Sequence, residues 1–174
     1  MLGKAVGRMF DREWKKKIIA SYDEKREATL DVLKKILHFP FHPDTQLILF
    51  EIQGYSGTFG LTPFAMKDSD YHIDEDAFGT PLYKTQFGKF SFGLSAYNYL
   101  DEVKQMSPEE IGELDDLAID CLCEWLANLY HEVSGNFPIT CMIQIHDTTG
   151  VYSLQEREWL TEEEFDDYFE TDKE

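Results

Sequence analysis

The residues in this chain best placed to do chemistry together are four carboxylates on one side of a predicted helix. They recur at three- and four-residue spacing, which brings them to one helix face: Glu113, Asp116, Asp120 and Glu124. Paired carboxylates act as general acid and base in glycosidase-type sites, but that chemistry needs a cleft and unequal pKa values. The sequence gives neither, so we interpret these four residues, the acidic row, as a binding surface and expect no catalytic residue among them.

The helix that must position the acidic row is predicted over Ser107–Gly135. Ser107 is a good N-cap, Pro108 suits the first helical position, and Glu110 completes a capping box. Apolar residues then recur with helical spacing on the opposite face, and Gly135 can end the helix in a left-handed conformation. The helix contains no Lys or Arg. Because a row of like charges costs stability, the missing cations are the strongest functional hint in the chain.

A second candidate site involves histidines. His146 and Asp147 follow a predicted strand, and a His–Asp pair can orient a general base. Catalysis would also require a nucleophile or metal, and adjacent residues of a strand point to opposite faces. An alternative function is therefore a small enzyme or ligand-binding domain that uses the aromatic segment 78–99 with His72 or His146.

No complete set of metal ligands or cofactor motif can be assembled. The acidic loop Asp68–Asp76 resembles part of a calcium loop, but Ile73 stands where that loop needs Gly and Gly79 where it needs Glu. His38 and His42 are four residues apart, but a proline between them breaks the helix that would align them. We therefore expect no metal and no cofactor.

The cysteines and the N-terminus bear on the compartment. Cys121, Cys123 and Cys141 make an odd number, and no secretory signal or long apolar span accompanies them. Cys121 lies on the apolar helix face and Cys123 projects about 200° away, so the two cannot share a metal. These features predict a reduced, cytoplasmic protein without a membrane span.

Charge is the sharpest feature of the composition. The net charge is −18, from 16 basic and 34 acidic side chains, and it is unevenly placed. Residues 1–43 carry +4 and residues 44–174 carry −22. Such a surface repels nucleic acid and anionic lipid and attracts basic proteins, although acidity also serves solubility alone.

The apolar patterns predict an α+β fold in a single domain, 1–174. We expect a mainly antiparallel sheet of about five strands, two long helices packed on it and a short acidic C-terminal helix. The predicted strands are Gln46–Gln53, Leu61–Lys67, Phe90–Leu94, Ile139–Ile145 and Val151–Gln155. The predicted helices are Phe10–Leu37 with a break near Lys25–Arg26, a short one within Ser95–Gln105, Ser107–Gly135, and one capped by Thr161. Residues 1–9 form a loose lead-in, and the acidic segment 156–174 either docks or frays.

These observations lead to one hypothesis and two alternatives. The leading hypothesis is an acidic protein-binding module, such as an inhibitor or immunity-type protein that blocks a basic nuclease, because nuclease sites are basic to hold phosphate. The alternatives are the small enzyme or ligand-binding domain described above and a regulatory subunit of a complex. The lysine-rich first helix is either a solvated face or a docking surface for acidic groups of a partner or of this chain.

Overall fold

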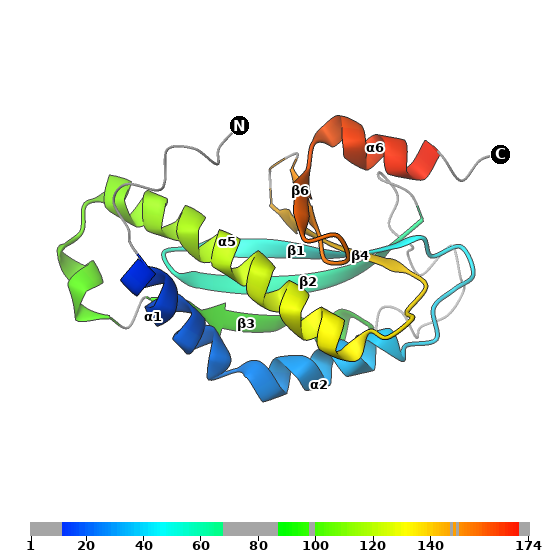
Figure 1. The fold of residues 1–174 in the computed structure, drawn as a ribbon, viewed down its shortest axis with the longest axis horizontal. Coiled ribbons are helices and arrows are strands. Elements are labelled where there is room, and N and C mark those ends of the chain that lie inside the picture. Colours follow the sequence, from blue (N-terminus) through cyan, green and yellow to red (C-terminus); the bar gives the residue numbers. More distant parts are fainter. Residues whose placement is uncertain (1–11, 68–86, 98–99, 147, 149, 171–174) are drawn as a thin grey trace.

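A six-stranded mixed sheet is the centre of the molecule (Figure 1). The computed structural model describes residues 12–67, 87–97, 100–146, 148 and 150–170. Its strands are β1 (Leu47–Tyr55), β2 (Thr58–Met66), β3 (Phe92–Ser95), β4 (Thr140–Ile145), β5 (Val151–Ser153) and β6 (Glu158–Leu160), in the order β3-β2-β1-β4-β5-β6. The predicted α+β class is confirmed.

The strand pairings are antiparallel except at the centre of the sheet, where β1 and β4 run parallel. The prediction of about five mainly antiparallel strands is therefore roughly right, with one strand missed. The missed strand is β6, which has only three residues and thus shows no readable alternation. The four-residue stretch Leu47–Phe50 is buried on both faces of the sheet, which explains why it reads as a continuous apolar run.

The longest helix is α5 (Pro108–Val133), and its ends follow the sequence prediction. The Ser107 hydroxyl accepts the Glu110 amide proton at 3.3 Å, and the Ser107 amide donates to the Glu110 carboxylate at 2.6 Å. These bonds lower the pKa of Glu110 and satisfy amides that the first helical turn leaves unpaired. Gly135 adopts a φ of +53° just beyond the helix, as its type allows.

The lysine-rich first segment forms two helices rather than one. α1 (Arg12–Asp23) and α2 (Arg26–Leu37) are separated by a turn at residues 24–25, beside the break that the sequence suggested. The short helix predicted within Ser95–Gln105 is mostly wrong. Ser95 belongs to β3, and among the described residues of this stretch the helical ones are Asp101–Gln105, which form the 3₁₀ turn η3. Another 3₁₀ turn, η2 (Phe87–Phe90), precedes β3.

The sheet separates two clusters of buried side chains. On one face, Ile48, Phe50 and Ile52 contribute to the main core, which α1, α2 and α5 cover. On the other face, Leu47 and Leu49 form a smaller cluster with Phe165 of α6 (Glu162–Glu170). The C-terminal helix therefore docks on the body through Phe165.

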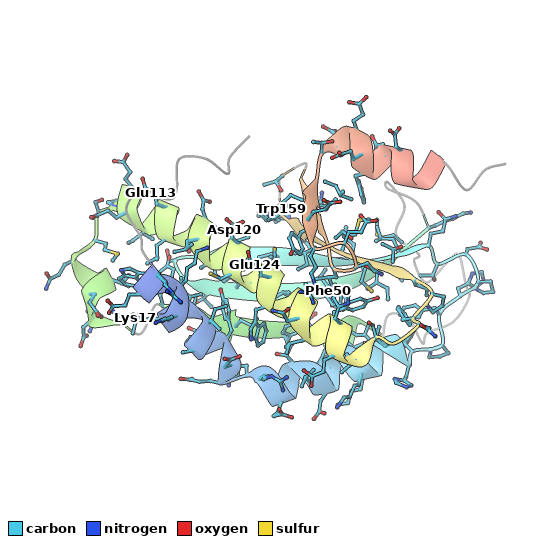
Figure 2. All side chains as sticks on the ribbon, in the orientation of Figure 1. Lys17, Phe50, Glu113, Asp120, Glu124 and Trp159 are labelled. Carbon is cyan, nitrogen blue, oxygen red and sulfur yellow. The ribbon has the colours of Figure 1, made fainter. Side chains whose placement is uncertain are left out.

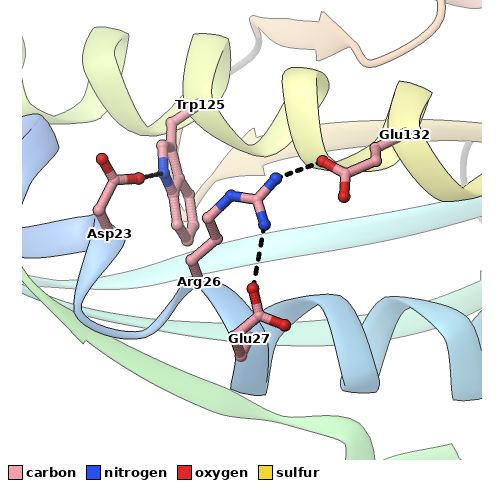
Figure 3. Close-up of polar contacts among 5 residues, drawn as sticks. All are labelled: Asp23, Arg26, Glu27, Trp125 and Glu132. Carbon is pink, nitrogen blue, oxygen red and sulfur yellow. Dashed lines mark hydrogen bonds and ion pairs between the residues drawn. The ribbon is translucent and has the colours of Figure 1, made fainter.

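Polar contacts join the helices on the main face (Figure 3). The Trp125 indole nitrogen of α5 donates to Asp23 at the end of α1 over 2.8 Å. Arg26 at the start of α2 pairs with Glu132 of α5 and with its neighbour Glu27. Since the Lys17 ammonium also pairs with Glu102 at 2.9 Å, basic residues of the first helical segment contact acidic groups of this same chain.

Candidate acidic interface

The acidic row lies along the side of α5 that faces away from the sheet. Asp116, Asp120 and Glu124 are exposed, and Glu113 is half-buried, so the expectation of full exposure fails for Glu113. The arrangement follows from helix geometry, because the row lies opposite the positions that pack on the sheet. Figure 2 shows Glu113, Asp120 and Glu124 following one another along this side of the helix.

An exposed tryptophan borders the row, and the sequence analysis did not select it. Trp159 of β6 lies across from the middle of α5 (Figure 2), and its indole is close enough to the Asp120 carboxylate to lower the pKa of that group, against the effect of burial. The ring packs edge-on against Tyr152 of β5 with the centroids 5.4 Å apart, yet Trp159 keeps 40% of its surface exposed. No local pattern could have indicated this contact, since it depends on how a three-residue strand pairs.

A lysine from another helix also lies near the acidic row. α5 has no Lys or Arg of its own, but the positive charge of Lys15 on α1 acts on the Asp120 carboxylate. The row is therefore not as isolated from cations as the helix sequence suggested. Lys15 borders it on the α1 side, and Trp159 borders it on the β6 side.

The carboxylates of the row are less well solvated than their exposure suggests. Burial and the adjacent Asp115 raise the pKa of Asp116. Burial also raises the pKa of Asp120, where the negative charges of Glu124 and Asp116 add to the effect while the Trp159 indole and Lys15 oppose it. The folded state therefore disfavours charge at these two positions, and a bound cation would relieve that cost.

Replacing Asp120 by Asn should raise the melting temperature at neutral pH by about 1–2 °C, after allowance for solvent screening. The folded-state pKa of Asp120 lies above its ordinary value of 3.8, so its charge destabilises the fold at pH 7. The penalty shrinks as the pH falls through the folded-state pKa and is lost below the ordinary value of 3.8, where the group is protonated in both the folded and the unfolded state. Thermal melts of D120N and wild type at pH 7 and pH 3.5 measure this. If the difference in melting temperature between D120N and wild type is the same at both pH values, the charge of Asp120 does not destabilise the fold.

The alternative site around His146 is only partly described. The His146 Nδ1 atom lies 3.3 Å from a carboxylate oxygen of Glu51 on β1, and Gln53 donates to the same oxygen. His72 and Asp147 lie outside the described residues. By register, Glu51 shares a sheet face with Leu49, which is the face opposite α5. The two candidate sites are thus on opposite sides of the molecule.

The described part of the aromatic segment 78–99 belongs mainly to the core. Leu94, Ala96 and Tyr97 are buried in the main cluster, and Phe90 and Phe92 pack against it. Residues 78–86, 98 and 99 lie outside the described residues. The described aromatic rings therefore fill the interior and do not form an open stacking platform.

The cysteines are unsuited to reaction or metal binding. All three are free and buried. Burial raises the pKa of Cys121 to about 11 and raises those of Cys123 and Cys141 as well, so the thiols stay protonated. Within the described residues, no group of three or more His, Cys, Asp or Glu side chains is arranged to hold a metal ion. The Asp68–Asp76 loop lies outside them.

Asp115, next to the acidic row, has a structural role that the sequence analysis missed. Its carboxylate accepts the amide protons of Ser56 and Gly57, each at 2.8 Å, and the Tyr97 hydroxyl at 2.6 Å. Ser56 and Gly57 have φ values of +55° and +76° and form the tight turn between β1 and β2. Asp115 thereby fixes the β1–β2 hairpin to α5.

Comparison of the chain with models of known protein families, with curated proteins and with solved structures finds no match. None of the helices within the described residues is long and apolar enough to cross a membrane. The features of this chain that bear on function are therefore the geometry and charge of the acidic row and the exposed Trp159.

Proposed function

We propose that this chain is a protein-binding module that presents the acidic row of α5, with Trp159 at its border, to a basic protein partner. The observation that carries the proposal is Trp159, which keeps 40% of its surface exposed beside the Asp120 carboxylate. Tryptophan is among the residues that contribute most to binding energy at protein interfaces. An exposed indole beside carboxylates offers both an apolar contact and an attraction for cationic side chains.

The charge of the chain favours a basic partner in particular. The net charge of −18 steers a basic protein towards this surface and accelerates its association. Burial disfavours the charged forms of Asp116 and Asp120 and raises the pKa of each. The cationic groups of a partner would stabilise these charges. An inhibitor or immunity-type protein that covers the basic site of a nuclease has this character, and it is the class we favour.

Replacing Asp116, Asp120 and Glu124 by Lys should slow association with the partner by about 10- to 100-fold, because charge reversal converts steering into repulsion. The partner is captured from the native host, identified, and purified as a salt-labile basic protein. Association rates with wild type and variant are then measured over a range of salt concentrations. The variant should show a flatter salt dependence, since fewer favourable long-range interactions remain to be screened.

A matched control reverses three other exposed carboxylates, which lie in α2 or in the segments that flank it: Glu24, Asp31 and Asp44. It changes the net charge by the same amount but leaves the acidic row intact, so it should slow association much less. Both variants should melt within a few degrees of wild type. If the two variants slow association equally, the acidic row attracts the partner only through the overall negative charge of the chain. That result would contradict the proposed interface.

A further inference from the structure

The edge of the sheet beside the acidic row has an open backbone. β6 is the last strand in the sheet order and pairs with β5 on one side, and no described strand lies on its other side. An edge strand presents N–H and C=O groups that can pair with another extended chain. Glu158 and Trp159 are both exposed, so the described parts of the chain do not bury these two residues of the strand.

Trp159 points to the α5 side of this edge. It pairs with Tyr152 in the strand register, and Tyr152 belongs to the main core that α5 covers. Because side chains alternate along a strand, every second residue of a chain added next to β6 would project to the same face of the sheet as Trp159. The same side chains would be directed towards Asp120, which lies beside Trp159.

We infer that the open edge of β6 binds an extended, arginine-bearing segment of the partner, which adds to the sheet as a seventh strand. A guanidinium group of that segment stacks on the Trp159 ring and pairs with Asp120 and Glu124. Arginine suits this position better than lysine, since its planar group stacks on indole and donates two parallel hydrogen bonds to a carboxylate. The inference rests on the proposed function and specifies how the partner is bound.

The charges around β6 select this occupant over a second copy of the chain. Glu156 precedes the strand and Glu158 is its first residue. Glu162 and Glu163 follow it at the start of α6. Two such edges pairing with each other would place like charges in close contact, which is destabilising. A cationic strand instead meets attraction from these four carboxylates, against the single like charge of Arg157 within residues 156–163. Short length and charge protect edge strands from self-association, and here they leave the edge open to a basic segment.

The test uses a synthetic peptide of alternating arginine and threonine and a second peptide of the same sequence that is N-methylated at every inner amide. Methylation removes the backbone donors but keeps the charge. The unmethylated peptide should bind the full chain at least about tenfold more tightly. It should also protect from hydrogen exchange those amides of Glu158–Leu160 that face away from β5. Trp159→Ala should weaken its binding by about tenfold or more while the melting temperature stays close to that of wild type.

The outcomes separate strand addition from the proposed function. Equal binding of the two peptides, or no amide protection in β6, overturns strand addition even if the acidic row still attracts basic proteins. The unmethylated peptide is also tested on the variant in which the acidic row is changed to Lys. If it still binds this variant and still protects β6, strand addition is supported but the proposed role of the row is contradicted. Absence of binding at about 1 mM unmethylated peptide at low salt overturns the inference.

Discussion

Trp125→Ala should lower the free energy of unfolding by about 3–5 kcal/mol, a loss typical of truncating a buried aromatic side chain. Trp125 is 5% exposed and packs against the Tyr22 ring with the centroids 5.6 Å apart. Its indole also donates to Asp23 at the end of α1 (Figure 3). Removing the ring therefore leaves a cavity between α1 and α5 and removes the hydrogen bond that joins α5 to Asp23. The total free energy of unfolding of a domain is roughly 5–15 kcal/mol, so this loss would be a large part of it.

Two variants separate the contributions of packing and hydrogen bonding. Trp125→Phe keeps most of the ring volume but removes the donor to Asp23, so it should cost only about 1–2 kcal/mol. Trp159→Ala makes the same chemical change at a 40% exposed position, and it should cost about 1 kcal/mol or less. Denaturant melts of the three variants provide the comparison. A loss below about 1 kcal/mol for Trp125→Ala would show that α5 does not depend on this anchor.

The parts of the fold that the sequence predicted are those with strong local patterns. α5 has a capping box, helical apolar spacing and a terminal glycine, and each of these signals acts within a few residues. β1 and β4 contain continuous apolar runs, Leu47–Phe50 and Cys141–Ile143, which are typical of a buried central strand. In contrast, β6 has only three residues, and its pairing with β5 determines its structure. The parallel pairing of β1 with β4 likewise joins segments far apart in the chain.

The candidate site divides in the same way. Helical spacing correctly placed Asp116, Asp120 and Glu124 on one exposed face, because that placement needs only the geometry of one helix. Trp159 and Lys15 come from other elements, so their positions beside Asp120 depend on tertiary packing that no spacing rule describes. The function proposed for this surface remains to be tested by the charge-reversal and peptide experiments.

Asp115→Ala should destabilise the fold by about 2–4 kcal/mol, although Asp115 is adjacent to exposed residues of the acidic row. Its carboxylate accepts hydrogen bonds from Ser56, Gly57 and the Tyr97 hydroxyl, and bonds to a charged acceptor contribute about 1.5–3 kcal/mol each. Water can replace part of this loss at the exposed Ser56 amide. Burial and the hydrogen bond to Asp115 raise the pKa of Tyr97, so its hydroxyl stays protonated and would lose its acceptor in the variant.

The neighbouring residue supplies a matched control for this prediction. Asp116→Ala removes the same charge one position along α5, from an exposed carboxylate whose pKa is raised by burial and by Asp115, and it should leave stability nearly unchanged or slightly higher. Denaturant melts compare the two variants, and hydrogen exchange at the Ser56 and Gly57 amides reports on the hairpin directly. Exchange at these amides should accelerate in Asp115→Ala and not in Asp116→Ala. Equal stability of the two variants, or unchanged exchange at the turn, would mean that α5 does not fix the hairpin and that β1 and β2 hold their turn without it.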